Sequence, residues 1–363
     1  MKKLSLVLSV ILCLSLLAAC GSTPAPEAVP TAEPTPEVTT EPEPTEEPAP
    51  AFVTVEDGRD RPSNRGQLQV IDGSLCGEDG QPVMLRGVSS YGLPMGDGFV
   101  NEPLFYELSQ DLGVNVFRLA MYTYGVGAVG YCTGGNQEQV KQTVLNGVEL
   151  AAKADMYAIV DWHVLQDGDP NQFIDEAMTF FAEVSETLAD CNNVLYEICN
   201  EPNGVEWPDI KSYAESVIPV IRENDPDSVI IVGTPIWSQR VDEAAKDPLE
   251  FDNLLYTLHF YSATHKDELR AVAQEARDAG LPIFVTEYGI TAASGGFPRD
   301  LEEADRWIDF LEEEGISYCM WSFSKIPEPC SAIRNTCLKY NGFTEEDYTE
   351  TGLWLIETLK NHK

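Results

Sequence analysis

The sequence is poor in basic residues. It has 23 lysines and arginines against 60 aspartates and glutamates, which gives a formal net charge of −37 at pH 7. A protein that neutralises nucleic-acid phosphates needs a basic face, so this balance argues against a nucleic-acid partner. A neutral polymer is neither attracted nor repelled by an acidic surface, so uncharged ligands remain an open class.

The N-terminus lacks an apolar run long enough for a comfortable membrane span. A charged start at Met1-Lys2-Lys3 is followed by a short apolar run that ends in Leu17-Ala18-Ala19-Cys20. This pattern is typical of an export signal, and its last four residues resemble the bacterial lipobox, whose cysteine carries lipid after cleavage. We therefore expect a signal peptide over residues 1–19 and a bacterial cell-surface lipoprotein whose only membrane contact is a lipid on Cys20. The alternative is an ordinary cleaved signal with a chance cysteine.

Basic residues are also absent between Lys3 and Arg59, and from Ser22 to about Asp57 proline, glutamate, threonine and alanine dominate. Such a segment cannot bury a core and its like charges repel, so residues 20–59 are expected to form an extended, disordered linker. The remaining residues, 60–363, are large for a β-sandwich and ordinary for one (β/α)₈ barrel. We expect a single catalytic domain and a monomer.

The sequence pattern of a metal site is missing too. There is no C-x-x-C pair and no histidine cluster with zinc spacing, so we expect neither a metal nor a cofactor. Without the signal and Cys20, seven of the nine cysteines are left, and at least one of them must be unpaired. Cys199 and Cys319 fall in apolar runs and are expected to be buried thiols, whereas Cys330 and Cys337 lie in one loop and could pair.

Short apolar, β-branched runs alternate with amphipathic stretches, which is the pattern of repeated βα units around a buried parallel sheet. The eight expected strands cover residues 83–88, 115–120, 157–162, 194–199, 229–232, 254–259, 283–286 and 318–321. The expected outer helices cover residues 137–153, 171–188, 211–222, 267–279 and 300–313. Two Asp-Gly turn signals within residues 68–81 predict a small hairpin under the barrel floor. The predicted fold class is therefore an α/β (β/α)₈ TIM barrel preceded by a hairpin.

Polar residues gather where these strands end, which is where barrel enzymes carry their active sites. Glu201 follows the fourth strand and Glu287 follows the seventh. A lone glutamate there is usually a solvated loop residue, but two could meet, because strands four and seven face each other across the barrel mouth. Retaining glycoside hydrolysis needs one protonated carboxyl and one carboxylate about 5 Å apart. We predict that Glu201 and Glu287 are this pair.

The environments of the two carboxyls should separate their pKa values, as an acid and a nucleophile require. A cation such as Arg118 and the Tyr261 hydroxyl beside Glu287 would keep Glu287 ionised. The negative charge of Glu287 would in turn raise the pKa of Glu201, which could then donate a proton.

Several runs together carry a family resemblance. They are Leu-Arg-Gly at 85–87, Gly-Val-Asn-Val-Phe-Arg at 113–118, Asp-Trp-His at 161–163, Tyr-Glu-Ile-Cys-Asn-Glu-Pro-Asn-Gly at 196–204, His-Phe-Tyr at 259–261, Thr-Glu-Tyr-Gly at 286–289 and Trp-Ser at 321–322. In this order they resemble glycoside hydrolase family 5, the cellulases, and most nearly its Bacillus-type endo-β-1,4-glucanases, from about residue 68 to the end. The resemblance implies a β-glucan polysaccharide as substrate, and a double displacement in which Glu201 is the acid/base and Glu287 the nucleophile.

The resemblance also implies how the substrate is held. Asn200 would bind the sugar 2-hydroxyl. The other residues expected around the reacting sugar are Arg118 and Tyr261 beside the nucleophile, His163 and His259 at the border of the site, and Trp321 as the platform. Trp237, and with less support Trp207, are candidates for stacking on further sugars, while Trp162 is expected to be a packing residue.

Two departures from the family pattern loosen the prediction of substrate. Where the subfamily usually has His-Gly-Leu-Gln-Trp, this sequence has Tyr91-Gly92-Leu93-Pro94-Met95, which replaces a histidine by a phenol and removes a stacking tryptophan. The usual lysine after Trp321 comes one place early, as Lys325. Mixed-linkage glucan, glucomannan and mannan are therefore alternative substrates. A non-catalytic glycan-capture lipoprotein would commonly lose a carboxylate, and a metal-dependent barrel hydrolase would be expected to show an H-x-H strand end.

Overall fold

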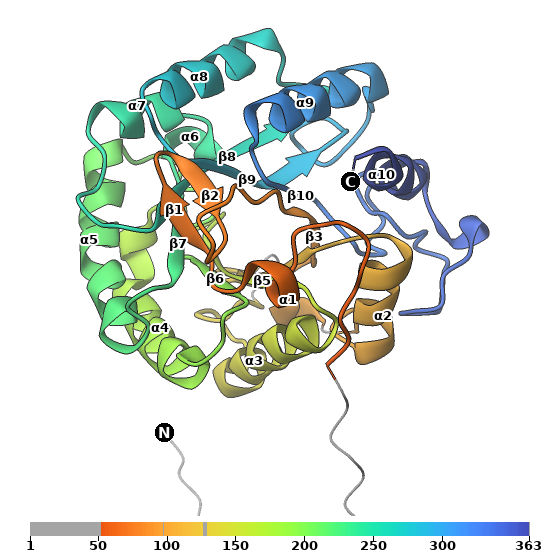
Figure 1. The fold of residues 1–363 in the computed structure, drawn as a ribbon, viewed down its shortest axis with the longest axis horizontal. Coiled ribbons are helices and arrows are strands. Elements are labelled where there is room, and N and C mark those ends of the chain that lie inside the picture. Colours follow the sequence, from red (N-terminus) through yellow and green to blue (C-terminus); the bar gives the residue numbers. More distant parts are fainter. Residues whose placement is uncertain (1–51, 97, 126–128, 363) are drawn as a thin grey trace, which may run out of the picture. The chain divides into compact units, whose positions relative to one another are not determined.

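The computed structural model describes residues 52–96, 98–125 and 129–362. The expected signal peptide, Cys20 and most of the expected linker lie outside the described residues. The described residues form a closed barrel of eight parallel strands surrounded by helices (Figure 1). The prediction of a (β/α)₈ barrel is confirmed.

Each predicted strand overlaps one strand of the barrel. In chain order these are β3 (Arg86–Ser89), β4 (Val116–Tyr122), β5 (Tyr157–His163), β6 (Val194–Glu197), β7 (Val229–Val232), β8 (Leu254–Tyr261), β9 (Ile283–Gly289) and β10 (Tyr318–Met320). The barrel closes where β10 pairs with β3. Strands β3 and β4 approach closely at Gly87, because a Cβ there would lie 2.2 Å from the carbonyl oxygen of Val116.

The outer layer consists of helices that follow the strands. The longer ones are α3 (Gln137–Lys153), α4 (Ile174–Leu188), α5 (Trp207–Asn224), α7 (Val241–Lys246), α8 (Asp267–Asp278), α9 (Leu301–Glu314) and α10 (Glu350–Asn361). The short ones are α1 (Pro62–Arg65), η1 (Leu93–Met95), α2 (Glu102–Tyr106), η2 (Glu107–Asp111), η3 (Pro170–Phe173), α6 (Pro235–Ser238) and η4 (Glu345–Asp347). No helix among the described residues is long and apolar enough to cross a membrane.

Local sequence explains the helix limits. In α9, Asp300 caps the first turn by accepting from the Glu303 N–H, and Gly315 ends the helix in the left-handed region. The helix predicted at 211–222 begins earlier, at Trp207, because a proline fits its first turn. The single helix predicted at 171–188 is two consecutive helices in the structure, η3 and α4.

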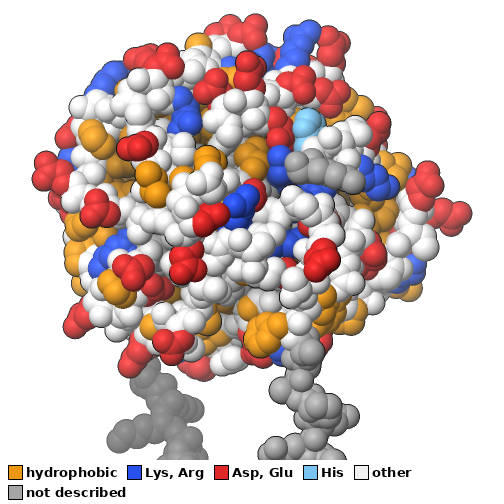
Figure 2. Space-filling view, viewed as in Figure 1, with side chains coloured by type: hydrophobic (Ala, Val, Ile, Leu, Met, Phe, Trp, Pro, Cys, Tyr) orange, Lys and Arg blue, Asp and Glu red, His pale blue; other side chains and the backbone are white. Residues whose placement is uncertain are grey.

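The predicted hairpin is present as β1 (Gln69–Ile71) paired with β2 (Ser74–Cys76). It lies across one end of the barrel (Figure 1), where Leu68 and Leu75 pack on the apolar side chains at the starts of the strands. Figure 2 shows the same face, with acidic and basic side chains interspersed around it. Because the hairpin covers this floor, the polar residues at the opposite ends of the strands form the open face.

Residues just before the barrel also pack on this floor. The Val53 N–H donates to the Lys153 carbonyl, at the end of α3. Arg61 is fully buried and donates to Asp57 at 2.7 Å and to the Asp155 carbonyl at 3.1 Å. The part of the chain that packs on the barrel therefore begins before residue 60.

All seven cysteines among the described residues are free thiols. Cys199 and Cys319 are buried, as predicted. Cys330 and Cys337 do not pair with each other; their sulfurs contact Glu328 at 3.5 Å and Asp347 at 3.4 Å. The disulfide considered from the sequence is therefore not formed.

Candidate active site

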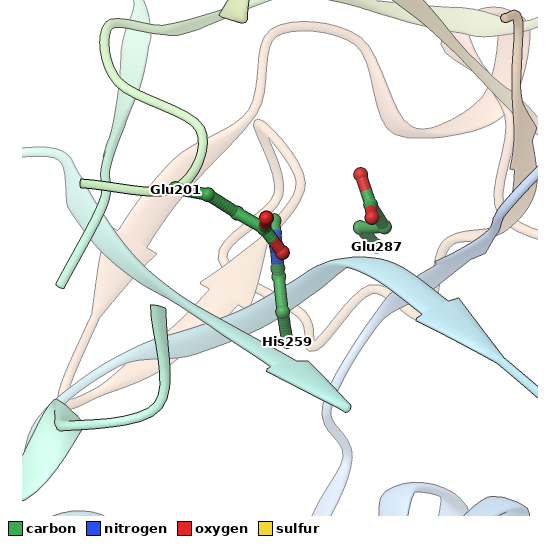
Figure 3. A group of neighbouring side chains, drawn as sticks. All are labelled: Glu201, His259 and Glu287. Carbon is green, nitrogen blue, oxygen red and sulfur yellow. The ribbon is translucent and has the colours of Figure 1, made fainter. Parts of the chain in front are cut away.

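Glu201 and Glu287 lie together at the open face of the barrel (Figure 3). Glu287 belongs to β9, and Glu201 reaches in from the loop after β6, where its backbone N–H donates to the Val164 carbonyl at 3.1 Å. One oxygen of each carboxyl and one ring nitrogen of His259 all lie within 4.8 Å of one another. Both glutamates are less than a tenth exposed. The two carboxyls are therefore close enough to act on one small group of atoms.

Glu287 is held by two donors. Arg118 Nη1 donates to its Oε2 at 3.2 Å, and the Tyr261 hydroxyl donates to its Oε1 at 2.7 Å. Burial raises the pKa of Glu287, while the Arg118 charge and the Tyr261 hydrogen bond act in the opposite direction. These contacts fix the carboxylate in place and favour its charged form.

Glu201 has a different environment. Its Oε1 lies 2.9 Å from Nδ1 of His259. His259 belongs to β8 and is paired with Glu287 of the adjacent strand β9. Burial raises the pKa of Glu201 well above its ordinary value, and the charge of Glu287 raises it further. Burial and the Arg118 charge lower the pKa of His259 well below its ordinary value, so its ring is neutral.

Two further buried carboxyls, to which the sequence analysis gave no role, surround Arg118. Glu197 accepts from Arg118 Nε at 2.7 Å and from Nη2 at 3.1 Å, and Asp161 lies 3.0 Å from Nη2. Burial raises the pKa of each to about 7. A charged residue inside an apolar strand was the available signal, because a buried charge needs a partner.

Glu197 is also connected to Glu201. The Thr286 hydroxyl donates to Glu197 Oε1 at 2.7 Å, and Thr286 Oγ1 lies 2.9 Å from His259 Nε2. The other ring nitrogen of His259 contacts Glu201. A continuous chain of hydrogen bonds therefore joins Glu197 to Glu201.

Aromatic rings form one wall beside Glu287. Trp321 stacks on His163 with centroids 5.2 Å apart, and Tyr91 packs against Trp321 at 5.8 Å. His163 Nδ1 lies 2.6 Å from Asp161, and burial with the Arg118 charge lowers the pKa of His163 to about 3. The ring of His163 is therefore neutral and supports the tryptophan platform.

Asn200 contacts His163 of this wall and is fully buried. Its Oδ1 accepts from Arg118 at 2.6 Å, which fixes the orientation of the amide. One amide N–H donates to the Val164 carbonyl at 2.9 Å, and the amide nitrogen lies 3.4 Å from His163. Arg118, Val164 and His163 therefore hold the Asn200 amide in one orientation.

Trp237 lines a cleft of about 460 Å³ together with Glu201, His259 and Tyr261. Its side chain is 43% exposed, and it is the middle of three consecutive residues with positive φ, from Ile236 to Ser238. The Trp237 N–H donates to the Pro202 carbonyl, and the Ser238 hydroxyl donates to the Asn200 carbonyl at 2.6 Å. The unusual backbone is thus tied to the segment that carries Glu201.

Two aromatic expectations resolve in opposite ways. Trp162 is fully buried against Tyr131 and Phe180, as expected for a packing residue. The suggestion that Trp207 stacks on substrate is wrong: it is buried, and its indole N–H donates to the Asp247 carbonyl at 2.8 Å.

The close grouping of Glu201, His259 and Glu287 supplies three donor atoms that could hold a metal ion. Each of these side chains already has a hydrogen-bond partner in the protein. His259 contacts Glu201 and Thr286. Glu287 accepts from Arg118 and Tyr261. These contacts account for the arrangement without an ion.

Comparison with known proteins agrees with this geometry. Residues 76–326 match the family model "Cellulase (glycosyl hydrolase family 5)". The chain is 43% identical over 302 residues to Endoglucanase A of Butyrivibrio fibrisolvens, covering 82% of this chain and 70% of that protein. It is 41% identical over 296 residues to an endoglucanase of Clostridium saccharobutylicum, covering 81% of this chain and 65% of that protein. The chain thus spans about two thirds of the length of these relatives.

Solved structures show the same likeness. The cellulase Cel5C_n aligns with a TM-score of 0.79 at 43% identity, covering 84% of this chain and 95% of that one. A variant of the Thermobifida fusca endoglucanase Cel5A catalytic domain, in complex with cellotetraose, aligns with a TM-score of 0.78 at 37% identity, covering 82% of this chain and 99% of that one. From the family model, the relatives and the shared barrel together, the chain belongs to the cellulases of glycosyl hydrolase family 5 and is a glycoside hydrolase.

Proposed function

We propose that this chain is a retaining endo-β-1,4-glucanase that hydrolyses internal bonds of β-1,4-glucan. The observation that carries the proposal is the separation of at most 4.8 Å between an oxygen of Glu201 and one of Glu287. Retaining enzymes place their carboxyls about 5 Å apart, whereas inverting enzymes leave roughly 6.5 to 9.5 Å for a water. Relatives that are named endoglucanases support the substrate class.

In the first step, the Glu287 carboxylate attacks the anomeric carbon and Glu201 gives its proton to the departing oxygen. The glycosidic bond breaks as the bond between Glu287 and the sugar forms. In the second step, Glu201 takes a proton from water, whose oxygen attacks the same carbon and releases Glu287. Arg118 and Tyr261 stabilise the carboxylate of Glu287 before attack and after release.

The hydrogen-bond chain supports the assignment of Glu201 as the acid. The Thr286 hydroxyl has one hydrogen and gives it to Glu197, so its oxygen accepts from His259 Nε2–H. The ring of His259 is neutral, which leaves Nδ1 without a proton. Nδ1 therefore accepts from Glu201, and Glu201 is the protonated partner.

The remaining residues hold the sugar. Trp321 forms the platform under the reacting ring, supported by His163, and Asn200 donates an amide N–H to the 2-hydroxyl when the sugar is bound. His259 borders the ring beside Glu201. Trp237 stacks on a sugar of the leaving group, because it shares a cleft with the acid that protonates that group. Tyr91 contacts the sugar beyond the platform, next to Trp321.

A substrate panel tests the proposal. Reducing ends released from carboxymethyl cellulose, barley glucan and mannan should show turnover of the first two. Tyr91 fills the place of the usual histidine and Met95 that of a stacking tryptophan, which favours mixed-linkage glucan, glucomannan or mannan as the second candidate. Turnover of mannan without turnover of either glucan would contradict the β-1,4-glucanase proposal and favour the second candidate.

The assignment of the nucleophile predicts the effect of Glu287→Gln. The amide keeps the shape but cannot attack, so kcat should fall roughly a thousandfold or more. Glu250→Gln, an exposed glutamate outside the site, serves as the control and should match the parent. A Glu287→Gln enzyme that retains most of its activity would refute both the role and a retaining mechanism based on it.

We further propose that the enzyme is a secreted monomer carried at the cell surface by a lipid on Cys20. The support is the lipobox-like end of the apolar run in the sequence. Labelling cells with a radioactive fatty acid should mark the parent and not Cys20→Ser. Equal labelling of both would contradict the anchor.

A further inference from the structure

We propose that Ser238, in the loop after β7, is a positioning residue for the acid Glu201 and acts through its hydrogen bond to the Asn200 carbonyl. The inference rests on the proposed function, in which Glu201 gives a proton in the first step and takes one in the second. Ser238 is fully buried and is not among the side chains that hold the sugar. Its effect on the reaction therefore passes through the backbone that carries Glu201.

The segment that carries Glu201 runs past the end of its sheet ladder. The last paired residues of β6 and β7 are Glu197 and Ile231, and one further hydrogen bond follows, from the Ile198 N–H to the Ile231 carbonyl. Beyond it, Glu201 projects from a loop (Figure 3). Buried backbone groups need hydrogen-bond partners, so the carbonyls of this loop must find donors outside the ladder.

The loop after β5 holds one side of this segment. The Asn200 N–H donates to the Trp162 carbonyl at 3.2 Å, and the Glu201 N–H donates to the Val164 carbonyl at 3.1 Å. These two bonds use backbone N–H groups only. The carbonyls of the segment remain to be paired from the β7 side.

The loop after β7 supplies both of the missing donors. The Ser238 hydroxyl donates to the Asn200 carbonyl at 2.6 Å, and the Trp237 N–H donates to the Pro202 carbonyl at 3.1 Å. The two accepting carbonyls belong to the residues just before and just after Glu201. The backbone of the acid is thus fixed from two loops, and one of its four bonds comes from a side chain.

This donor is presented by an unusual backbone. Ile236, Trp237 and Ser238 have φ of 59°, 53° and 55°, a region that residues other than glycine rarely adopt. Such conformations persist where surrounding contacts hold them, and they are concentrated at functional sites. Ser238 Oγ also accepts from the Thr234 N–H at 3.2 Å. Because a hydroxyl has one hydrogen, this contact leaves that hydrogen for the Asn200 carbonyl.

Loss of this bond should displace the acid without displacing the nucleophile. Glu201 must keep its Oε1 within 2.9 Å of His259 Nδ1 and within hydrogen-bond reach of the departing oxygen. A shift of about 1 Å in a reacting group reduces the rate by a large factor. Glu287 is held by Arg118 of β4 and Tyr261 of β8, which do not depend on the loop after β7.

Ser238→Ala in the full chain tests the inference. We expect kcat/KM for cellopentaose to fall roughly tenfold, because its leaving sugar needs a proton from Glu201. For dinitrophenyl cellobioside kcat/KM should stay unchanged, because its leaving group needs no proton. The kcat and the KM of this substrate should fall together, because hydrolysis of the glycosyl-enzyme limits its turnover and Glu201 activates the water.

Ser238→Gly separates the hydroxyl from the backbone conformation. Glycine adopts positive φ freely but donates nothing to Asn200, so this variant should lose as much activity as Ser238→Ala. It also carries the test if the alanine variant does not fold. Ser216→Ala is the matched control, because it removes a hydroxyl that donates to the Ser212 carbonyl within α5, and it should match the parent.

Three results would overturn the positioning role. They are an unchanged Ser238→Ala enzyme, equal losses of kcat/KM on the two substrates, and a Ser238→Gly enzyme as active as the parent. The last result would assign the effect to the backbone conformation and not to the hydroxyl. A parent that cleaves neither substrate would contradict the proposed function instead, so the two failures are distinguishable.

Discussion

Replacing Thr286 by valine removes the hydroxyl that joins His259 to Glu197. His259 is then free to present its other tautomer to Glu201, and acid catalysis should weaken. We expect kcat/KM to fall roughly a hundredfold for cello-oligosaccharides. For a dinitrophenyl cellobioside, whose leaving group needs no proton, kcat/KM should change little.

Thr286→Ser keeps the hydroxyl and is the control for this hydrogen-bond chain. Glu197→Gln should share the leaving-group dependence, with an added loss because Glu197 also holds Arg118. Equal losses on activated and unactivated substrates would assign Thr286 a structural role only.

The two carboxyls also predict a bell-shaped dependence of kcat/KM on pH. Glu287 must be ionised, so activity is lost as pH falls through its pKa. Glu201 must be protonated, so activity is lost as pH rises through its pKa, which burial and Glu287 raise well above the ordinary value. Glu201→Ala, assayed on the dinitrophenyl substrate, should lack the alkaline limb. Persistence of that limb would assign it to another group.

At the level of single residues, sequence patterns identified polar groups near the carboxyl ends of the strands, Arg118 among them, but gave no role to Glu197 or Asp161. Glu201 and Glu287 stand out because apolar runs precede them. Glu197 sits within such a run, and its contacts with Arg118 and Thr286 come from strands distant in sequence. Which buried charge meets which donor depends on barrel closure, which a linear pattern does not contain.

At the level of elements, the strands and long helices were predictable because their hydrophobic periods differ. The loop after β7 was not. Ile236 has φ of 59°, a region that β-branched residues rarely adopt, so its own residue type does not predict this conformation. The next two residues, Trp237 and Ser238, are hydrogen-bonded to Pro202 and Asn200, so the conformation of this loop depends on tertiary contacts that a local pattern does not contain.

For the whole domain, the packing of residues 53–61 on the barrel predicts where a truncation becomes harmful. A chain that starts at Asp60 loses Asp57, the carboxylate partner of the buried Arg61. We expect its free energy of unfolding in urea to fall by about 2 kcal/mol relative to a chain that starts at Phe52. Asp57→Asn in the longer chain should reproduce part of the loss. Equal unfolding midpoints for the two lengths would show that these contacts are dispensable.

The contacts of residues 53–61 also determine at which end of the barrel the preceding segment joins it. The chain joins the barrel beside the end of α3, at the end closed by the β1–β2 hairpin, while Glu201 and Glu287 open at the other end. A tether that pulls on residue 52 pulls on the closed end. The lipid anchor proposed at Cys20 would therefore be joined to the barrel at the end opposite the cleft that holds Glu201 and Glu287.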